Sequence, residues 1–153
     1  MTRQEQASGR RISRASATLQ NAATALHILL YRITKGTIGG SVAKSPVLLL
    51  TTKGRKSGKP RTVPLLYLKD NGNVVLVASN GGAARHPTWF LNLQANPEAE
   101  VQIGAVRRKV RAEQVSAAEK QRLWPFLTAM YPGYARYQEI TNRDIPVVIL
   151  RSI

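Results

Sequence analysis

The sequence predicts a single α+β domain in which about six short, mostly antiparallel strands form a sheet or barrel with peripheral helices. Three observations support this class. The 153 residues are enough for one hydrophobic core. The middle of the chain contains short aliphatic and β-branched runs separated by Gly, Pro and Asn turns. Helical periodicity precedes these runs and also separates some of them. No internal repeat or linker divides the chain.

The first expected element is a helix that begins near Leu19. Before it, residues 1–18 are rich in Arg and Ser and predict a flexible basic tail. The remaining residues, 19–153, form the single domain. An apolar stripe follows the helical period, at Leu19, Ala22, Ala23, Leu26, Leu29, Leu30 and Ile33. Such a basic amphipathic helix either packs on its own domain or lies on an anionic membrane, and the pattern leaves both open.

The other elements follow from turn signals. Asn71-Gly72 is a strong hairpin signal because both residues tolerate positive φ. Ser116 and Glu119 have the spacing of a capping box that opens a helix. Pro87 suits the first turn of a short helix, and Pro97 follows its end. We therefore expect strands at 47–52, 62–69, 74–78, 100–103, 107–115 and 147–151, and helices at 88–95 and 117–130.

The loop between the first two strands contains five cations and a hydroxyl, in the order Lys53-Gly54-Arg55-Lys56-Ser57-Gly58-Lys59-Pro60-Arg61. Its two glycines allow positive φ and close approach of a ligand to the backbone. Arg and Lys side chains there can donate charge-assisted hydrogen bonds to phosphate or carboxylate oxygens. The loop is either an anion-binding site or a solvated hairpin tip.

Composition narrows the classes of function. The formal net charge of +15 attracts polyanions such as nucleic acid, anionic lipid or a highly charged cofactor. Aromatic residues make up 6% of the chain and none lies within the cationic loop, which disfavours nucleic acid as a partner. The absence of cysteine excludes disulfides and thiol nucleophiles, and the two histidines lack metal-ligand spacing, so no metal site is expected. Arg143 and Asp144 are interpreted as a surface pair.

Targeting signals are weak. Arg10-Arg11 would suit a twin-arginine signal, but the following segment carries His27, Arg32 and Lys35 and makes a poor signal core. The sequence contains no apolar run of about 18 residues, so no transmembrane helix is predicted. A cytoplasmic location is expected, with the inner face of the cell membrane as a site of peripheral binding.

Several motifs occur together in order: Leu49-Leu50-Thr51-Thr52, Gly54-Arg55-Lys56-Ser57-Gly58, Pro60-Arg61, Val63-Pro64-Leu65, Ala78-Ser79-Asn80-Gly81-Gly82, Asn92-Leu93, Ala95-Asn96-Pro97 and Met130-Tyr131-Pro132. From about Leu26 to Leu150 the chain thereby resembles the deazaflavin-dependent nitroreductase family of actinobacteria. Members have a split β-barrel related to FMN-binding oxidoreductases. They use the reduced deazaflavin coenzyme F420 to reduce quinones and, in some cases, nitro compounds.

The resemblance implies a set of site residues. The family's phosphate- and tail-binding positions match Arg55, Lys56, Ser57 and Arg61. Positions that border or contact the coenzyme's ring system match Val63, Pro64, Ala78, Ser79, Asn80, Gly81, Gly82, Thr88, Trp89 and Asn92. The acceptor pocket is implied at Tyr131, Tyr134 and Tyr137, with Tyr134 as the catalytic hydrogen-bond donor to the reducible oxygen. Two positions depart from the family pattern, because relatives often have Lys at Asn80 and Asn at His86.

Other interpretations of these residues stay open. Trp89 and the three tyrosines could be ordinary packing residues. His86 could act as an acid–base group, although capping of the helix after Pro87 is favoured.

The function expected is hydride transfer from reduced coenzyme F420 to a quinone-like or nitroaromatic acceptor. The alternatives are a non-catalytic carrier of the coenzyme, an enzyme of the same barrel that uses FMN or a pyridoxal-type phosphate, and a nucleic-acid-binding module. The N-terminal helix is expected to border the acceptor pocket. The oligomeric state is left open.

Overall fold

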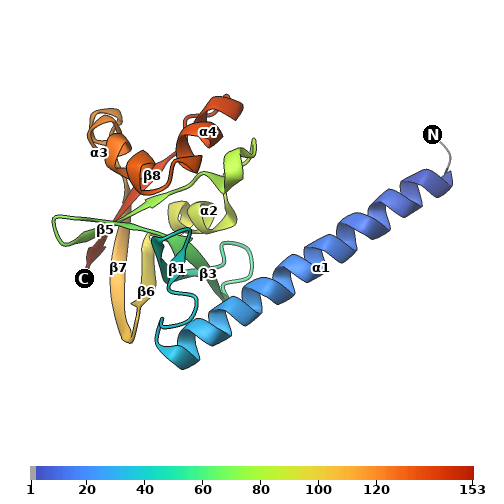
Figure 1. Ribbon diagram of the computed structural model, residues 1–153, viewed down its shortest axis with the longest axis horizontal. Helices are drawn as coiled ribbons and strands as arrows, with labels where there is room; N and C mark the ends of the chain where they lie inside the picture. Colours follow the sequence, from blue (N-terminus) through green and yellow to red (C-terminus); the bar gives the residue numbers. More distant parts are fainter. Residues whose placement is uncertain (1–2) are drawn as a thin grey trace.

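The computed structural model describes residues 3–153, and their side chains from residue 16 onward. The fold is α+β, with an eight-stranded antiparallel sheet curled into a split barrel and helices around it (Figure 1). The elements are α1 (Arg3–Thr34), β1 (Ser41–Val42), β2 (Ser45–Lys53), β3 (Pro60–Leu66), β4 (Leu68–Asp70), β5 (Asn73–Val77), the 3₁₀ turn η1 (Asn80–Gly82), α2 (Thr88–Ala95), β6 (Glu98–Ile103), β7 (Val106–Gln114), α3 (Ala117–Met130), α4 (Gly133–Ile140) and β8 (Val147–Ser152).

Strand β2 pairs with three other strands, β1, β3 and β6. The strand order is β1-β2-β6-β7-β8-β5-β4, and β3 also pairs with β2. The β2–β3 register runs from Val47 opposite Leu66 to Lys53 opposite Pro60. Because the two strands stay paired to their ends, the cationic loop forms the tip of a long hairpin.

The curled sheet encloses the main core. Leu48 and Leu50 of β2 pack inside it with Val74 and Leu76 of β5 and with Trp89 of α2. The alternate residues of β2, Val47 and Leu49, lie on the opposite face. Side chains of a strand point to its two faces in turn, so the run 47–50 of β2 is apolar because both of its faces are covered.

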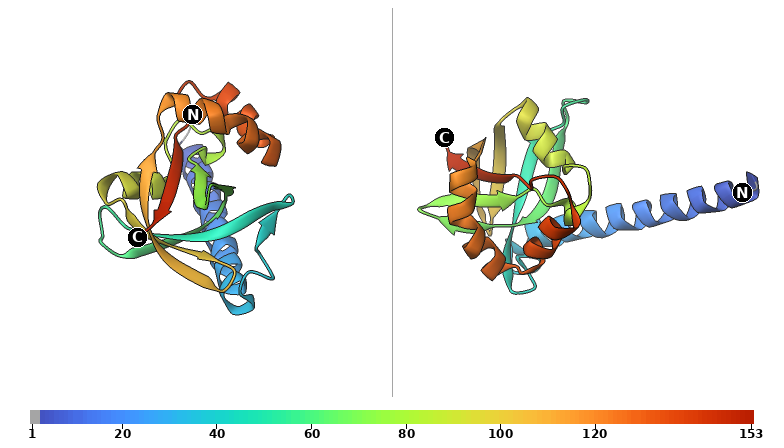
Figure 2. Two further views of the ribbon diagram at one scale, coloured as in Figure 1. Left: turned by 90° about the vertical axis from the view of Figure 1, so that its left-hand side faces the viewer. Right: turned by 90° about the horizontal axis from the view of Figure 1, so that it is seen from above.

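Helices α3 and α4 lie together on the outer face of β5 and β8 (Figures 1 and 2). Val75 and Val77 alternate with the inward residues of β5 and contact Leu123 and Leu127 of α3 in a second cluster. Tyr134 of α4 belongs to the same cluster. The strands that carry the core thus also fix where the tyrosines lie.

Helix α1 projects from the body of the domain (Figures 1 and 2). It begins at Arg3, earlier than the Leu19 start that the apolar period predicts; the mobility of residues 1–18 stays a prediction. Of the described α1 side chains, Tyr31 is the buried one, with Ile28 half-buried beside it. The stripe at Leu19, Leu26, Leu29 and Ile33 is exposed, so it is not the face through which the helix packs on the domain, which was one of the two possibilities that the pattern left open.

The other elements show where turn signals were sufficient. Helices 88–95 and 117–130 are confirmed, and the Ser116 hydroxyl accepts the predicted capping bond from Glu119 N. The second predicted strand is divided into β3 and β4 at Tyr67. The short β1, the turn η1 and helix α4 were not predicted. Within the described residues, no helix is long and apolar enough to cross a membrane.

Candidate functional site

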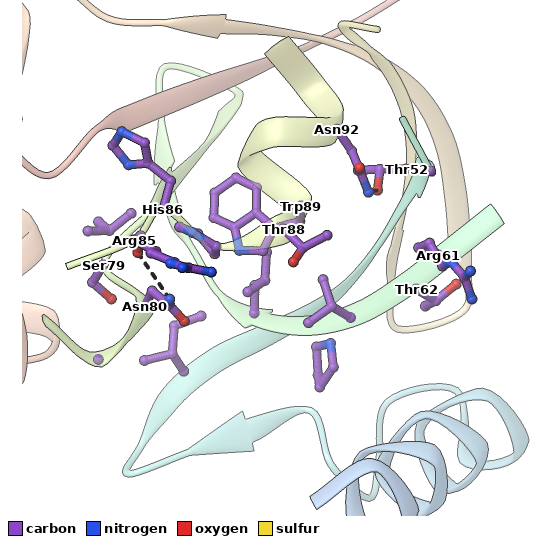
Figure 3. A pocket seen from close by; sticks show the side chains of 18 of the residues that line it. Thr52, Arg61, Thr62, Ser79, Asn80, Arg85, His86, Thr88, Trp89 and Asn92 are labelled. Atoms are coloured by element: carbon purple, nitrogen blue, oxygen red, sulfur yellow. Dashed lines mark hydrogen bonds between the residues drawn. The ribbon is translucent and has the colours of Figure 1, made fainter. Parts of the chain in front are cut away.

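A cavity of about 890 Å³ opens between the β2–β3 hairpin, the segment from η1 to α2, and the tyrosines around α4. In Figure 3, Trp89 lies at its centre, with Arg61 and Thr62 to one side and Asn80, Arg85 and His86 to the other. The predicted residues that line the cavity are Arg55, Lys56, Ser57, Arg61, Val63, Pro64, Ser79, Asn80, Gly81, Thr88, Trp89, Asn92, Tyr131, Tyr134 and Tyr137.

Two predicted residues, Ala78 and Gly82, do not line the cavity. Ala78 is fully buried in the barrel core. Gly82 is buried against α4, where a Cβ atom would lie 2.6 Å from the side chain of Ile140. Both residues therefore shape the wall from behind, because the turn that follows β5 directs only some of its residues toward the cavity.

The hairpin tip is held by its own backbone and by Asn92. Gly54 N donates to Lys59 O at 2.8 Å, which closes the loop. The Asn92 amide oxygen accepts from Arg55 N at 3.1 Å, and its nitrogen donates to Thr52 Oγ1 at 3.0 Å (Figure 3). Asn92 is 2% exposed. Because its amide is engaged at both ends, Asn92 orients the cationic tip from inside the domain.

The cations of the tip have no acidic partner among the described residues. The ion pairs among the described residues lie on other parts of the chain, such as Lys120 with Asp144 and Arg122 with Asp70. Arg55, Lys56 and Arg61 are exposed at the cavity. No carboxylate among the described residues offsets their mutual repulsion, and an anionic ligand would relieve it.

The middle of the cavity is apolar. Trp89 is 7% exposed and packs edge-on against Phe90 in the core. It also forms part of the cavity wall, together with Val63, Pro64 and Leu65. Trp89 is therefore both a core residue and a lining residue of the cavity.

The three tyrosines form the far wall. Tyr131 follows α3, whereas Tyr134 and Tyr137 lie on α4 after the break at Pro132. The hydroxyls of Tyr131 and Tyr137 are 3.1 Å apart and hydrogen-bonded. Tyr134 is 5% exposed and packs edge-on against Tyr131, so it is a core residue as well as a wall residue.

The Tyr134 hydroxyl makes no hydrogen bond to the described residues, yet no buried side-chain oxygen or nitrogen among them lacks a partner. The hydroxyl must therefore reach the open space of the cavity. Burial and the two neighbouring tyrosines raise the pKa of Tyr134 well above its usual value. Like an ordinary tyrosine phenol, it is protonated at neutral pH and can donate a hydrogen bond.

The η1 side of the cavity contains residues that sequence reasoning misread. His86 does not cap α2; the cap position is Pro87 and no side chain bonds there. Its Nδ1 instead lies 3.1 Å from Arg143 Nη1. Arg143 is not paired with Asp144, whose carboxylate contacts Lys120 at 2.6 Å. The Asn80 side chain donates to Arg85 O at 3.1 Å (Figure 3).

Further lining residues were not predicted, namely Thr52, Gly54, Thr62, Leu65, Leu66, Val77, Arg85, His86 and Pro87. The alternation of β3 could have indicated Leu65, because Val63 was already placed on the cavity. For Arg85, the positive charge is the one feature of the sequence that could have indicated a place in an anion-binding cavity. Conversely, the prediction that the N-terminal helix borders the pocket is wrong for residues 16–34, none of which lines the cavity.

Comparison with known proteins decides the family. The sequence profile of the F420H2-dependent quinone reductases matches residues 24–152. The chain belongs to this family. It is 41% identical over 129 residues to the F420H2-dependent quinone reductase of Mycobacterium tuberculosis, covering 82% of this chain and 87% of that protein. A second M. tuberculosis protein, provisionally assigned the same activity, is 48% identical over 106 residues, covering 69% and 89%.

Solved structures agree with this result. One described as an F420H2-dependent reductase has a TM-score of 0.64 and 42% identity, and the match covers 69% of this chain and 94% of the other. Another, described as a domain-swapped dimer, has a TM-score of 0.66 and 40% identity, covering 78% and 90%. The family resemblance and the split-barrel fold are confirmed, and the chain is an F420H2-dependent oxidoreductase.

The residues of this family member fit the coenzyme that the family uses. Coenzyme F420 combines a flat ring system with a phosphate and an oligoglutamate arm. The cavity offers an apolar centre at Trp89 and Pro64 for the ring, and unpaired cations at the hairpin tip for the arm. The family match favours this coenzyme over FMN and over nucleic acid.

The two hydrogen bonds of the Asn92 side chain predict that its loss lowers both stability and coenzyme binding. Asn92→Ala leaves Arg55 N without its acceptor, so the free energy of unfolding should fall by about 1–3 kcal/mol. Coenzyme affinity should fall as well, because the tip is no longer held. Denaturant unfolding and fluorescence titration measure the two effects. Gln94→Ala, on an exposed position of the same helix, is the control, and equal behaviour of the two variants would contradict this role.

Proposed function

We propose that this chain reduces a quinone-like acceptor by two electrons, with Tyr134 at the acceptor end of the cavity and the hairpin tip at the coenzyme end. One observation carries the proposal: a single cavity joins unpaired cations, an apolar centre and a buried phenol that stays protonated. When bound, the reduced deazaflavin supplies the hydride and both electrons. The protein must bind, orient and exclude water.

The hairpin tip would hold the anionic arm of the coenzyme. Arg55, Lys56 and Arg61 supply donors for its phosphate and carboxylate oxygens, and the glycines allow the backbone to approach. Ser57 already accepts from Lys59 N at 3.2 Å, so its hydroxyl hydrogen is free to be donated to the ligand. Ser79, Asn80 and Gly81 would border the ring, and Figure 3 shows Ser79 and Asn80 on the side of Trp89 away from Arg61.

The tyrosine wall would receive the acceptor. Negative charge develops on the acceptor oxygen as the hydride arrives, and a donor aimed at that oxygen stabilises the transition state. Tyr134 is placed to donate, because its hydroxyl reaches the cavity while its ring is fixed in the core. Tyr131 and Tyr137 hold each other by their hydroxyl contact and narrow the wall around it.

Loss of a cation from the tip should weaken coenzyme binding. Lys56→Ala and Arg61→Ala should each reduce affinity by about 1–3 kcal/mol, the scale of one hydrogen bond to a charged group. Turnover of the saturated enzyme should change less, since the arm is remote from the reacting carbon. Fluorescence titration measures the affinity. Lys69→Ala removes the same charge at an exposed position outside the cavity and serves as the control. Unchanged affinity in both tip variants would refute the assignment.

Removal of the Tyr134 hydroxyl should affect turnover alone. Tyr134→Phe keeps the ring and its packing, so coenzyme affinity should hold while turnover with a soluble quinone falls about 10- to 1000-fold. Oxidation of the reduced coenzyme, followed by absorbance, measures the rate. Tyr137→Phe is the matched control for loss of a wall hydroxyl. A Tyr134→Phe enzyme as fast as the parent would show that Tyr134 only packs, and a parent that binds without turnover would be a carrier.

We further propose that α1 brings the enzyme to an anionic membrane surface, where quinones with apolar tails reside. The exposed stripe supports this: Leu19 is 71%, Leu26 55% and Ile33 68% exposed. Arg32 and Lys35 lie near its end, and each cation close to an anionic leaflet adds about 1 kcal/mol before screening. Arg10, Arg11 and Arg14 would add to this, although their side chains lie outside the described residues.

Membrane binding should be reversible and weakened by salt. Full-length protein should sediment with anionic vesicles at low salt and remain in the supernatant with neutral ones. Leu26→Asn combined with Leu29→Asn should abolish sedimentation, whereas Val106→Asn, an exposed apolar site on β7, should not. Parent protein that never sediments would refute the idea. If the parent is instead a dimer and the Leu26→Asn, Leu29→Asn variant is a monomer, the stripe binds a second copy of the chain.

A further inference from the structure

Arg143 occupies an unusual position for an arginine. Its guanidinium is half-buried behind the cavity and has no acidic partner among the described residues. Nε donates to Ala83 O at 2.9 Å, Nη1 to Ala78 O at 3.1 Å, and Nη2 to Ser79 O at 2.6 Å. One side chain thus collects three carbonyl groups from both ends of the η1 turn.

The same guanidinium reaches the start of α2. Nη1 lies 3.1 Å from His86 Nδ1. Because a guanidinium only donates, Nδ1 must accept, so the neutral ring carries its proton on Nε2. The other face of the imidazole packs on Phe90, with ring centroids 4.9 Å apart. His86 is therefore oriented from two sides, and it lines the cavity.

The base of Arg143 is fixed as firmly as its tip. Gln138 of α4 donates from Nε2 to Arg143 O at 2.9 Å, and its Oε1 accepts from Ile145 N and from Lys120 Nζ, each at 3.0 Å. Lys120 in turn contacts Asp144. A continuous set of hydrogen bonds therefore runs from α3 through the end of α4 to the η1 turn.

The two segments that Arg143 joins are adjoining walls of the cavity. The η1 turn presents Ser79 and Asn80, while α4 presents Tyr134 and Tyr137. They also touch directly at Gly82, which leaves no room for a side chain beside Ile140. A substitution at Arg143 is therefore expected to shift these walls relative to each other.

We propose that Arg143 is a positioning residue for hydride transfer, whose forked guanidinium sets the η1 wall against the α4 wall and orients the His86 imidazole. The roles of the two walls rest on the proposed function, whereas the contacts of Arg143 do not depend on it. A fork is required because three carbonyls and a ring nitrogen lie in different directions, which one ammonium group cannot match. A misplacement of about 1 Å can cost about a hundredfold in rate.

The His86 contact gives an independent readout. Burial, and next the charge of Arg143, lower the pKa of His86. Arg143 is the charged group that faces the ring from the α4–β8 loop, Phe90 of α2 is uncharged, and Arg85 precedes His86 in the chain. Below about pH 6.5 the unfolded chain takes up a proton that the folded ring resists, so stability should fall as pH falls through this range.

The test compares Arg143→Met and Arg143→Lys with the parent, using menadione as the acceptor. Both variants should lower kcat about 10- to 100-fold. The hairpin tip that would hold the arm of the coenzyme is untouched, so coenzyme affinity should fall by a smaller factor than kcat. Arg151→Met is the control, since this exposed arginine does not line the cavity and its ion pair is a 3.9 Å contact with Glu113. Thermal unfolding shows which variants are folded, and Arg143→Lys carries the test if Arg143→Met is not.

Proton NMR titration of the two histidines completes the experiment without coenzyme. His86→Gln assigns the signals. The midpoint of His86 should rise toward its ordinary value in Arg143→Met. Parent kcat in either folded variant would overturn the proposal, as would a lowered kcat with an unchanged His86 midpoint in Arg143→Met. If the parent binds coenzyme independently of Lys56 and Arg61, the proposed function fails, whereas the titration still tests Arg143.

Discussion

The pairing of β2 with β3 is the constraint on which the rest of this structure depends. The register from Val47 opposite Leu66 to Lys53 opposite Pro60 places Leu48 and Leu50 in the barrel core. The same register carries the cationic residues to the hairpin tip, beyond the point where apolar packing ends. A slip of one residue would reverse every side chain of β2 between its two covered faces. Core and site are therefore specified by one alignment.

Charge and apolarity are separated along this hairpin and across the cavity. The tip concentrates cations without carboxylates, while the centre at Trp89 is buried and the tyrosine wall is uncharged. Repulsion within the tip is tolerated because the β2–β3 ladder and the Asn92 amide hold the backbone in place. The excess positive charge of the chain is thus concentrated in part where a polyanionic coenzyme would enter, rather than being spread as a uniform surface property.

Much of this could be predicted from the sequence, because the signals were local. The Asn71-Gly72 turn, the Ser116 cap and the runs of β2, β5 and β8 each act over a few residues, and the family motifs placed most of the cavity lining. What could not be predicted depends on distant contacts. Asn92 and Thr52 meet only after folding, and Arg143 beside Asp144 has the pattern of an ordinary surface pair. The packed face of α1 centres on Tyr31, whereas the sequence pattern draws attention to the longer leucine stripe, which is exposed.

Tyr31 makes α1 a lever with a short inner arm. Its hydroxyl donates to Gln102 O at 3.2 Å and accepts from Gly104 N at 2.9 Å, so one oxygen joins the helix to the β6–β7 turn. At a rise of 1.5 Å per residue, the helix extends about 42 Å beyond this fulcrum, and a tilt of about 10° would move its far end by about 7 Å. Tyr31 also packs against Val47 and Leu49 of β2. A tilt of the helix would therefore be transmitted to the strand that ends in the cationic tip.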